Sequence, residues 1–412
     1  SFVPCDDDAT SPCRERLRQN TPFGTERCNV MKLATRKDDS RDGQLVVVSR
    51  DLKHAVMASR ITGTLQRALD DWAFMAPQLQ DLYDELNHGR APNSFPFDPD
   101  EYLSPLPRAF QRIEAGAYPA YEKRLQKARL VADAPLPEDI VPLKIAPSHA
   151  LLSPRGPVSM SYPDLRTDSG GRPVSTQETD PDDFATEMEA EEADEHAKAA
   201  APGTHRTVPV QDAAAREAAA RKAAARGGLD FSAQLVAICN DLPLNLTEDE
   251  ADRYLLLLGL ANAWRLHVTG DPAGRGRDRG LALAPVLVTP DELGEDWRAG
   301  RIHRPLHCRF NGRSTGKIDA AADMRFDFRQ LLQVLSRQAP VNAGALLCTG
   351  PVANADPDSG WTSLLEARAR RIIEESSQPG PAFMQPGDRI RIDMADARGH
   401  SLFGAIEQQV VA

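Results

Sequence analysis

The stretch Phe383-Met-Gln-Pro-Gly-Asp-Arg-Ile-Arg-Ile-Asp-Met394 is a clear indicator of the fold in this 412-residue chain. Its second half, residues 389–394, alternates charged and apolar side chains, which is typical of a half-buried β-strand. Four earlier segments also have strand character: residues 44–48, 231–238, 282–288 and 306–310. Asn311-Gly312, directly after the last of these, is a signal for a hairpin turn. The body of the chain is therefore predicted to be mostly β.

Two segments have helical character instead. Residues 65–86 are predicted to form a helix that is interrupted at Pro77, and its core-facing side chains are Leu65, Leu69, Trp72 and Leu79. Residues 361–375 are predicted to form a second helix. Together with the strands, these helices predict an α+β fold that is mostly β.

Further stretches occur in an order that points to one protein family. They are residues 31–35, 42–52, 65–72, 95–98 and 103–108 in the first part of the chain, and residues 288–294, 383–394 and 402–406 in the last part. In this order they resemble the bacterial-type fumarylacetoacetate hydrolase family, and a long collinear match is more specific than a short motif. The resemblance implies a mixed β-roll with a small amino-terminal domain, and commonly a dimer that forms through the roll.

The resemblance also implies a metal site, and this chain departs from the family there. Family members hold a divalent cation with an Asp, a Glu-x-Glu pair on one strand and a second Asp after a neighbouring strand. In this chain the pair falls on Ser232 and Gln234, and the second Asp falls on Ala263. Because a hard cation needs anionic oxygen ligands, we expect no metal and no other cofactor. The first metal Asp belongs within residues 145–180, where the resemblance does not place it.

The catalytic positions of the family are changed as well. The family's catalytic His falls on Tyr121, and its substrate-binding Thr falls on Pro351, which has neither a hydroxyl nor a backbone N–H. The glycine-rich loop that carries the family's lysine corresponds to residues 270–280, where the nearest side chains are Arg277, Asp278 and Arg279. These substitutions indicate a catalytically inactive member, a pseudoenzyme.

Two other interpretations stay open. If the alignment is shifted, intact ligands lie elsewhere, and the acidic run of residues 180–195 could supply them. The chain would then be a metal-dependent hydrolase that cleaves a carbon–carbon bond in a diketo acid, or a related decarboxylase of an oxo acid. The third interpretation is a free-standing regulatory dimer that binds a small acid without a metal ion.

Composition excludes several classes of partner. The formal net charge is −11, so we expect no direct contact with nucleic acid, and the local basic clusters are typical of solvated faces. The longest apolar run, residues 254–263, is about half of the roughly 20 residues that a transmembrane helix needs. The cysteines, which form no Cys-x-x-Cys pair, are Cys5, Cys13, Cys28, Cys239, Cys308 and Cys348. We expect reduced thiols, with pairing among the first three only in an oxidising compartment.

The chain divides into a family-like body and two added segments. Residues 1–30 form an amino-terminal extension, residues 31–110 the amino-terminal domain, and residues 111–144 a connecting segment. Residues 145–228 form an insertion that is extended and acidic, with an Ala-rich helix at residues 211–226 that has no apolar stripe. Residues 229–412, with parts of 111–144, form the β-roll.

The added segments suggest a role in an assembly. Their composition cannot bury a core, so we expect them to become ordered only against other proteins. We therefore predict a structural accessory subunit of a large mitochondrial complex, with the respiratory chain or the ATP synthase favoured and the mitochondrial ribosome next. The first residue, Ser1, fits removal of a targeting peptide and a place on the matrix side. The expected partners are other protein subunits, with a homodimer or a paired paralogue as further partners.

Deletion of residues 180–226 tests the role of the insertion. We expect the β-roll to stay folded, because this segment buries no core, while the protein leaves its assembly. Circular dichroism of the purified variant and native gel migration of the particle measure the two effects. An unfolded roll, or a variant that remains fully assembled, would contradict the prediction.

Overall fold

The computed structural model describes residues 29–131, 140–148, 151–160, 227–268, 276–338, 340–374 and 381–412. Several sequence predictions lie outside these residues. They are the extension up to residue 28 with Cys5, Cys13 and Cys28, the acidic run of residues 180–195, and the Ala-rich helix at residues 211–226.

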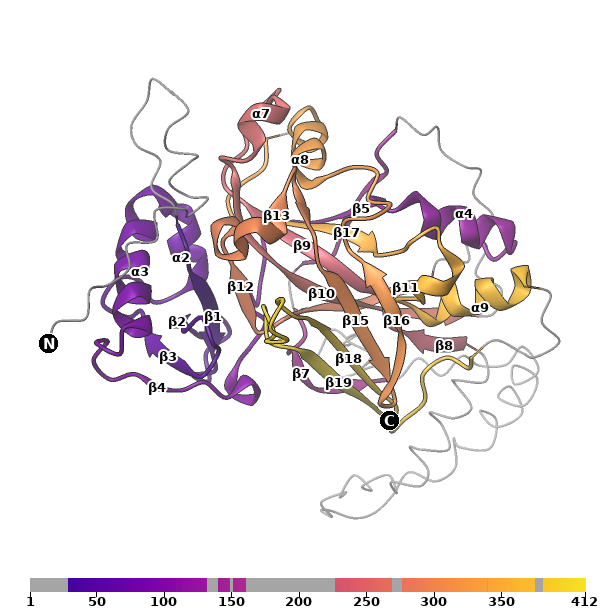
Figure 1. Cartoon of the computed structure of the whole chain (residues 1–412), viewed down its shortest axis with the longest axis horizontal. Coiled ribbons are helices and arrows are strands. Elements are labelled where there is room, and N and C mark those ends of the chain that lie inside the picture. The colour runs from indigo at the N-terminus through magenta and orange to yellow at the C-terminus, as the bar shows by residue number, and fades with distance from the viewer. Residues whose placement is uncertain are drawn as a thin grey trace, which may run out of the picture.

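The described residues form two large sheets and one small one (Figure 1). The first sheet has 12 strands, in the order β4-β3-β2-β1-β12-β10-β9-β17-β5-β6, with β8 and β11 also paired to β10. Its strands are β1 (Lys32–Arg36), β2 (Gln44–Val48), β3 (His54–Met57), β4 (Phe95–Pro96), β5 (Arg112–Ala115), β6 (Leu143–Ala146), β8 (Gly227–Asp230), β9 (Ala233–Cys239), β10 (Leu255–Val268), β11 (Arg277–Leu283), β12 (Val286–Val288) and β17 (Leu346–Pro351).

The second sheet has five strands in the order β16-β15-β18-β19-β7. These are β7 (Arg155–Ser159), β15 (Pro305–Phe310), β16 (Arg313–Asp319), β18 (Arg389–Met394) and β19 (Ile406–Val411), and the small sheet pairs β13 (Trp297–Arg298) with β14 (Arg301–Ile302). The hairpin between β15 and β16 turns at Asn311 and Gly312, both with positive φ, as the sequence predicts.

The helices lie around the sheets. They are α2 (Leu65–Asp70), α3 (Trp72–Asn87), α4 (Pro119–Lys127), α7 (Glu248–Ala251), α8 (Phe328–Ser336) and α9 (Leu364–Ile373), with short 3-10 turns η1 (Pro99–Glu101), η4 (Pro290–Asp296) and η5 (Pro357–Ser359). Helices α2 and α3 with β1 to β4 form the small amino-terminal domain, drawn in indigo in Figure 1. The predicted α+β fold with more strand than helix is thus confirmed. Among the described helices, none is long and apolar enough to cross a membrane.

The predicted break at Pro77 is wrong. The helical segment breaks at Asp71, whose φ of −135° and ψ of 48° separate α2 from α3, and α3 continues through Pro77. Proline removes the bond to the carbonyl four residues earlier, which belongs to the exposed Ala73, so water can take the place of the missing donor. The predicted core residues Leu65, Leu69, Trp72 and Leu79 are all buried.

The predicted strand at residues 282–288 is divided in two. Strand β11 ends at Leu283 and β12 begins at Val286, with Pro285 between them. Proline has no backbone donor for a sheet ladder and therefore interrupts the pairing. The predicted helix at residues 361–375 is shorter than expected, because Ser363 caps the first turn of α9 by accepting a hydrogen bond from Glu366 N.

The central strands β9 and β10 are buried on both faces. On one face Leu235, Ala237 and Leu260 join the core between the two large sheets, and on the other Val236 and Ile238 join the core under α2 and α3. Such a continuous apolar run is what a strand covered on both sides requires. Any side chain that must reach a cavity from these strands can do so only near their ends.

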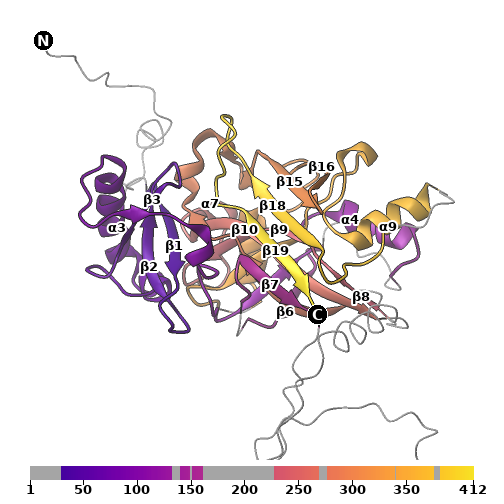
Figure 2. The ribbon, with the colours of Figure 1, turned by 90° about the horizontal axis from the view of Figure 1, so that it is seen from below.

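One buried amide connects the two large sheets. Gln408 on β19 accepts hydrogen bonds at Oε1 from Asn262 Nδ2 and Trp264 Nε1 of β10, both at 3.0 Å. Its Nε2 donates to the Ser153 carbonyl at 2.9 Å. Asn262 Oδ1 in turn accepts from Ser232 N at 3.0 Å. Figure 2 shows β18 and β19 lying across β9 and β10 at this point.

Substitution Gln408→Leu is expected to destabilise the fold by about 2–4 kcal/mol, because it leaves two buried donors without an acceptor. Urea denaturation measures the loss. The matched control is Gln409→Leu on the same strand, whose side chain is on the solvent side and should change stability by less than about 0.5 kcal/mol. Equal effects of the two substitutions would contradict the role given to Gln408.

Candidate functional site

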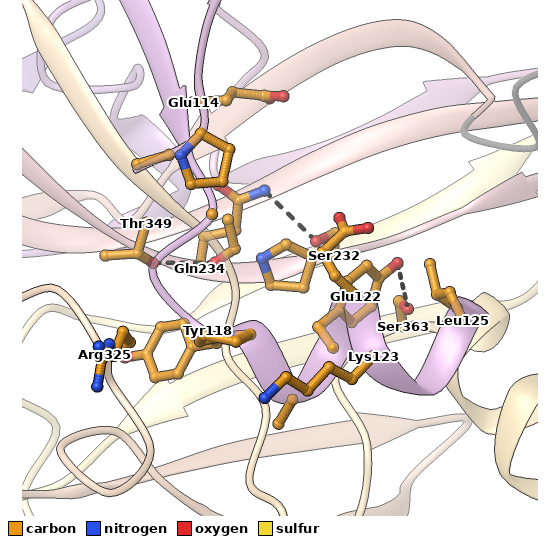
Figure 3. A pocket seen from close by; sticks show the side chains of 18 of the residues that line it. Glu114, Tyr118, Glu122, Lys123, Leu125, Ser232, Gln234, Arg325, Thr349 and Ser363 are labelled. Carbon is orange, nitrogen blue, oxygen red and sulfur yellow. Dashed lines mark hydrogen bonds between the residues drawn. The ribbon is translucent and has the colours of Figure 1, made fainter. Parts of the chain in front are cut away.

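A cavity of about 870 Å³ lies between α4, the ends of β9 and β17, and the outer part of β10 (Figure 3). Helix α4 contributes Tyr121 and Leu125, β10 contributes Arg265 and His267, and β17 contributes Thr349. The volume is within the range of about 300–1,000 Å³ that is usual for sites of small organic ligands. This cavity is therefore the candidate functional site.

Four of the five degenerate positions that the sequence predicts line this cavity, and the fifth lies in the core directly behind them. Tyr121, Ser232, Gln234 and Pro351 line it, and Pro351 stands opposite Gln234 in the pairing of β17 with β9. Ala263 lies beside them, because its backbone nitrogen donates to the Ser232 carbonyl at 2.9 Å. The structure thus brings together residues that are up to 230 positions apart in the chain. That they are degenerate positions of an ancestral site stays a prediction.

These residues do not fit a divalent cation. Ser232, Gln234 and Ala263 carry no charge, and Gln234 Nε2 donates to Ser232 Oγ at 3.4 Å. A dication about 4 Å from a carboxylate gains roughly 8 kcal/mol at an effective dielectric of about 20, and neutral oxygens do not replace this attraction. Within the described ranges, no group of three or more His, Cys, Asp or Glu side chains could hold a metal ion.

Asp230, one of the carboxylates that line the cavity, has a structural role. Its two oxygens accept hydrogen bonds from Leu364 N at 2.7 Å and Leu365 N at 2.9 Å, at the start of α9. The positive end of the helix stabilises the carboxylate charge. On its other side, His267 Nε2 lies 3.4 Å from Asp230 Oδ2, and the imidazole ring stacks on Phe383. Asp230 therefore connects β8, β10 and α9.

A second carboxylate, Glu114 on β5, is neutralised by two guanidinium groups. Its oxygens form ion pairs with Arg112 and Arg265, and Arg112 also pairs with Asp278 at 2.9 Å. Burial acts to raise the pKa of Glu114, but the charges of Arg265 and Arg112 outweigh it and hold the pKa below its usual value. Glu114 is thus ionised and compensated within the protein.

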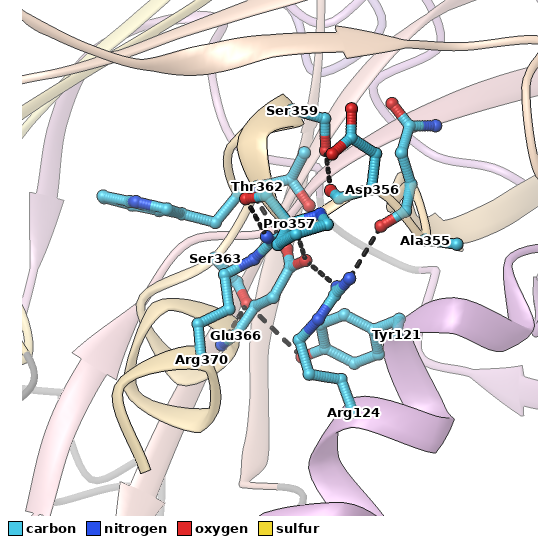
Figure 4. Close-up of polar contacts among 12 residues, drawn as sticks. Tyr121, Arg124, Ala355, Asp356, Pro357, Ser359, Thr362, Ser363, Glu366 and Arg370 are labelled. Carbon is cyan, nitrogen blue, oxygen red and sulfur yellow. Dashed lines mark hydrogen bonds and ion pairs between the residues drawn. The ribbon is translucent and has the colours of Figure 1, made fainter. Parts of the chain in front are cut away.

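A further buried carboxylate, Glu366 on α9, was not predicted from the sequence (Figure 4). It is 0% exposed and pairs with Arg124 of α4 and with Arg370 at 3.3 Å, while accepting from Thr362 N at 3.0 Å. Burial raises the pKa of Glu366, and both arginines oppose that shift. The signal that could have revealed Glu366 is its place on the apolar face of a predicted helix, where an acid requires a partner.

The Glu366 network fixes the wall of the cavity formed by α4. Arg124 Nη2 also donates to the Asn354 carbonyl at 2.6 Å, and the Tyr121 hydroxyl lies 3.4 Å from Ser363 Oγ. Burial raises the pKa of Tyr121 above its ordinary value. A neutral phenol can form hydrogen bonds but does not accept a proton from water near pH 7, so Tyr121 is no substitute for a catalytic imidazole.

The residues predicted for the glycine-rich loop and the cysteines lie elsewhere in the fold. Arg277 and Arg279 lie on β11 with Asp278, and residues 269–275 of the predicted loop lie outside the described residues. Cys239, Cys308 and Cys348 are buried free thiols, and burial raises the pKa of each to about 12. Such thiols are not reactive as thiolates.

Two family profiles match the chain. Residues 31–108 match the fumarylacetoacetase N-terminal domain 2, and residues 185–411 match the C-terminal domain of fumarylacetoacetate (FAA) hydrolase. The second match begins inside the segment that we assigned to an insertion, so the domain boundaries there stay a prediction. No curated protein matches the chain by sequence.

Solved structures share the fold. A probable 2-hydroxyhepta-2,4-diene-1,7-dioate isomerase from Mycobacterium abscessus has a TM-score of 0.53 at 14% identity, covering 93% of this chain and 98% of its own. Maleylpyruvate hydrolase from Sphingobium sp. SYK-6 has a TM-score of 0.51 at 13% identity, covering 92% of this chain and 99% of its own. At such identities the likeness shows the fold alone.

The uncharged side chains at the predicted metal positions lead us to expect weak metal binding by the unmodified full-length protein. Isothermal titration with Mg²⁺ or Mn²⁺ should give no saturable heat, because Ser232, Gln234 and Ala263 supply no charge. The triple variant Ser232→Glu, Gln234→Glu, Ala263→Asp should melt at a lower temperature without metal, because its carboxylates repel each other. It should still lack turnover, because Tyr121 and Pro351 remain. Tight binding by the unmodified protein would refute the prediction.

Proposed function

We propose, from the premise that this chain belongs to the fumarylacetoacetate hydrolase family, that it is a non-catalytic member with a structural role. The observation that carries the proposal is that Tyr121, Ser232, Gln234 and Pro351 line one cavity, with the backbone of Ala263 hydrogen-bonded to Ser232 beside it. Metal-dependent chemistry needs carboxylate ligands and a base there, and these side chains supply neither. The family fold persists without that chemistry.

The framework around the cavity supports a structural role. The three carboxylates Asp230, Glu114 and Glu366 are each paired with groups of the protein itself. The walls of the cavity therefore keep their arrangement without a metal ion. A member of this kind can serve as a stable scaffold on which other proteins assemble.

The proposed assembly is a large mitochondrial complex, in which the chain acts as an accessory subunit on the matrix side. The support is compositional: the segments at residues 1–30 and 145–228 are rich in charge, proline and alanine, and such sequences gain order on partners. A respiratory-chain or ATP-synthase complex is favoured over a mitochondrial ribosome, because the net charge of −11 disfavours contact with RNA.

The alternative is a metal-dependent hydrolase or decarboxylase of a diketo or oxo acid. It is favoured by the names of the similar structures, one of which is a maleylpyruvate hydrolase in complex with manganese (II) ion and pyruvate, at a TM-score of 0.51 and 14% identity. On this alternative, the acidic run at residues 180–195 supplies ligands that the cavity lacks among the described residues.

Turnover measurements separate the two proposals. The purified full-length protein is incubated with Mg²⁺ or Mn²⁺ and either fumarylacetoacetate or oxaloacetate, and substrate loss is followed by absorbance. We expect no loss beyond that in buffer with metal alone, and a maleylpyruvate hydrolase with its own substrate serves as the positive control. A rate of even a few per second, which is an ordinary enzyme rate, would establish the enzymatic alternative.

A further inference from the structure

Gln234 has a polar atom with no partner among the described residues. The side chain is 1% exposed and lines the cavity, its Nε2 donates to Ser232 Oγ at 3.4 Å, and its Oε1 has no hydrogen bond (Figure 3). If the amide were turned over, the unpartnered atom would be the nitrogen instead. In either orientation a buried amide is half satisfied, which is unusual in a native interior.

The neighbouring strand β17 has no backbone donor opposite Gln234 that could bond to its free oxygen. The residue opposite Gln234 across the sheet is Pro351, which has no backbone N–H to donate. Ser232 already contacts the Gln234 amide, and its hydroxyl can still donate to a further acceptor. Gln234 and Ser232 therefore present an acceptor and a donor next to each other. A ligand group that satisfies both must itself carry a donor and an acceptor side by side.

Two carboxylates that line the cavity together with this pair are already compensated. Glu114 is held by Arg112 and Arg265, and Asp230 is held by the first turn of α9. Glu114 and Asp230 line the same cavity as Gln234, so a ligand carboxylate there would have to compete with Glu114 for Arg265. The part of a ligand that reaches Gln234 is therefore expected to be uncharged.

The walls of the cavity are suited to a flat apolar group. Aromatic and aliphatic residues that line it are Tyr118, Tyr121, Leu125, Phe231, Phe326 and Leu365. Aromatic rings pack against such walls in offset or edge-to-face geometry and bury much apolar surface. The cavity thus combines these apolar walls with an uncharged polar pair at Gln234 and Ser232, and its lining also includes the charged side chains Glu122, Lys123, Lys144, Asp323 and Arg325.

From this arrangement we propose that the cavity binds an aromatic carboxamide without a metal ion. The ligand amide donates to Gln234 and accepts from Ser232, while its ring packs against the aromatic walls. Because a carboxamide carries both a donor and an acceptor, it satisfies Gln234 in either orientation of the side-chain amide. This proposal rests on the proposed non-catalytic function, since a cation bound at Ser232 and Gln234 would exclude the amide.

Benzamide and benzoate form a matched pair of probes, identical except that one carries an amide where the other carries a carboxylate. The full-length protein, without added metal, is titrated with each by calorimetry or ligand-observed NMR. We expect benzamide to bind at least about tenfold more tightly than benzoate, the ratio that corresponds to one hydrogen-bond pair. Substitution Gln234→Leu should weaken benzamide binding by a similar factor.

Two controls separate loss of recognition from loss of fold. Gln234→Leu should melt no lower than the unmodified protein, because the amide it removes is only half satisfied. Gln78→Leu on α3, outside the cavity, should leave benzamide binding unchanged. If Gln234→Leu does not fold, Ser232→Ala provides the second variant, with the same expected loss of preference for benzamide over benzoate.

Three outcomes would overturn the proposal. The first is no saturable binding of benzamide up to its solubility, which would indicate that water is the partner of the Gln234 amide. The second is equal affinity for benzamide and benzoate. The third is an unchanged affinity for benzamide in both the Gln234→Leu and the Ser232→Ala variants. Metal-dependent turnover of an oxo acid would refute the non-catalytic function instead. The binding experiments therefore test the carboxamide proposal, and the turnover experiments test the non-catalytic function separately.

Discussion

The hydrogen bonds that converge on Gln408 are the constraint on which the rest of the body depends. A single amide of β19 accepts from Asn262 and Trp264 of β10, and so joins the five-stranded sheet to the 12-stranded one. Asn262 in turn accepts a hydrogen bond from the backbone nitrogen of Ser232, which lines the cavity. Because the side chains in this buried hydrogen-bond network have partners, the network fixes the position of the two sheets relative to each other. It also fixes the position of Ser232 at the cavity.

Electrostatic compensation within the protein gives the cavity its shape. Asp230 is bound by the first turn of α9, Glu114 by two arginines, and Glu366 by Arg124 and Arg370. Removing one partner from such a buried set leaves a charge without compensation, which is far more costly than any exposed pair. These three carboxylates therefore hold β5, β10, α4 and α9 in place, and none of the three could bind a metal ion without disrupting this framework.

Much of the fold could be predicted from the sequence, because local signals and the family pattern agree. Strands at residues 44–48 and 389–394 were predicted with their observed bounds, since alternation and turn residues are local features. The break in the first helix was misplaced because the carbonyl that Pro77 leaves without a donor belongs to the exposed Ala73, where water can replace the donor. Exposure at a position depends on the fold and not on residue type. The positions around the cavity were identified by resemblance, yet Glu366 was missed, because its partner Arg124 comes from a helix more than 200 residues earlier in the chain.

Loss of charge at the cavity is itself compatible with a stable fold. Several carboxylates facing one another without a cation repel, so a metal site stores an energetic penalty that only the bound ion offsets. Under the proposed function, the neutral side chains of Ser232, Gln234 and Ala263 avoid that repulsion, and the Gln234 amide is left half satisfied. Sites that perform chemistry are commonly less stable than the same fold without them. The proposed non-catalytic function is therefore consistent with a fold that keeps its cavity and needs no metal ion for its stability.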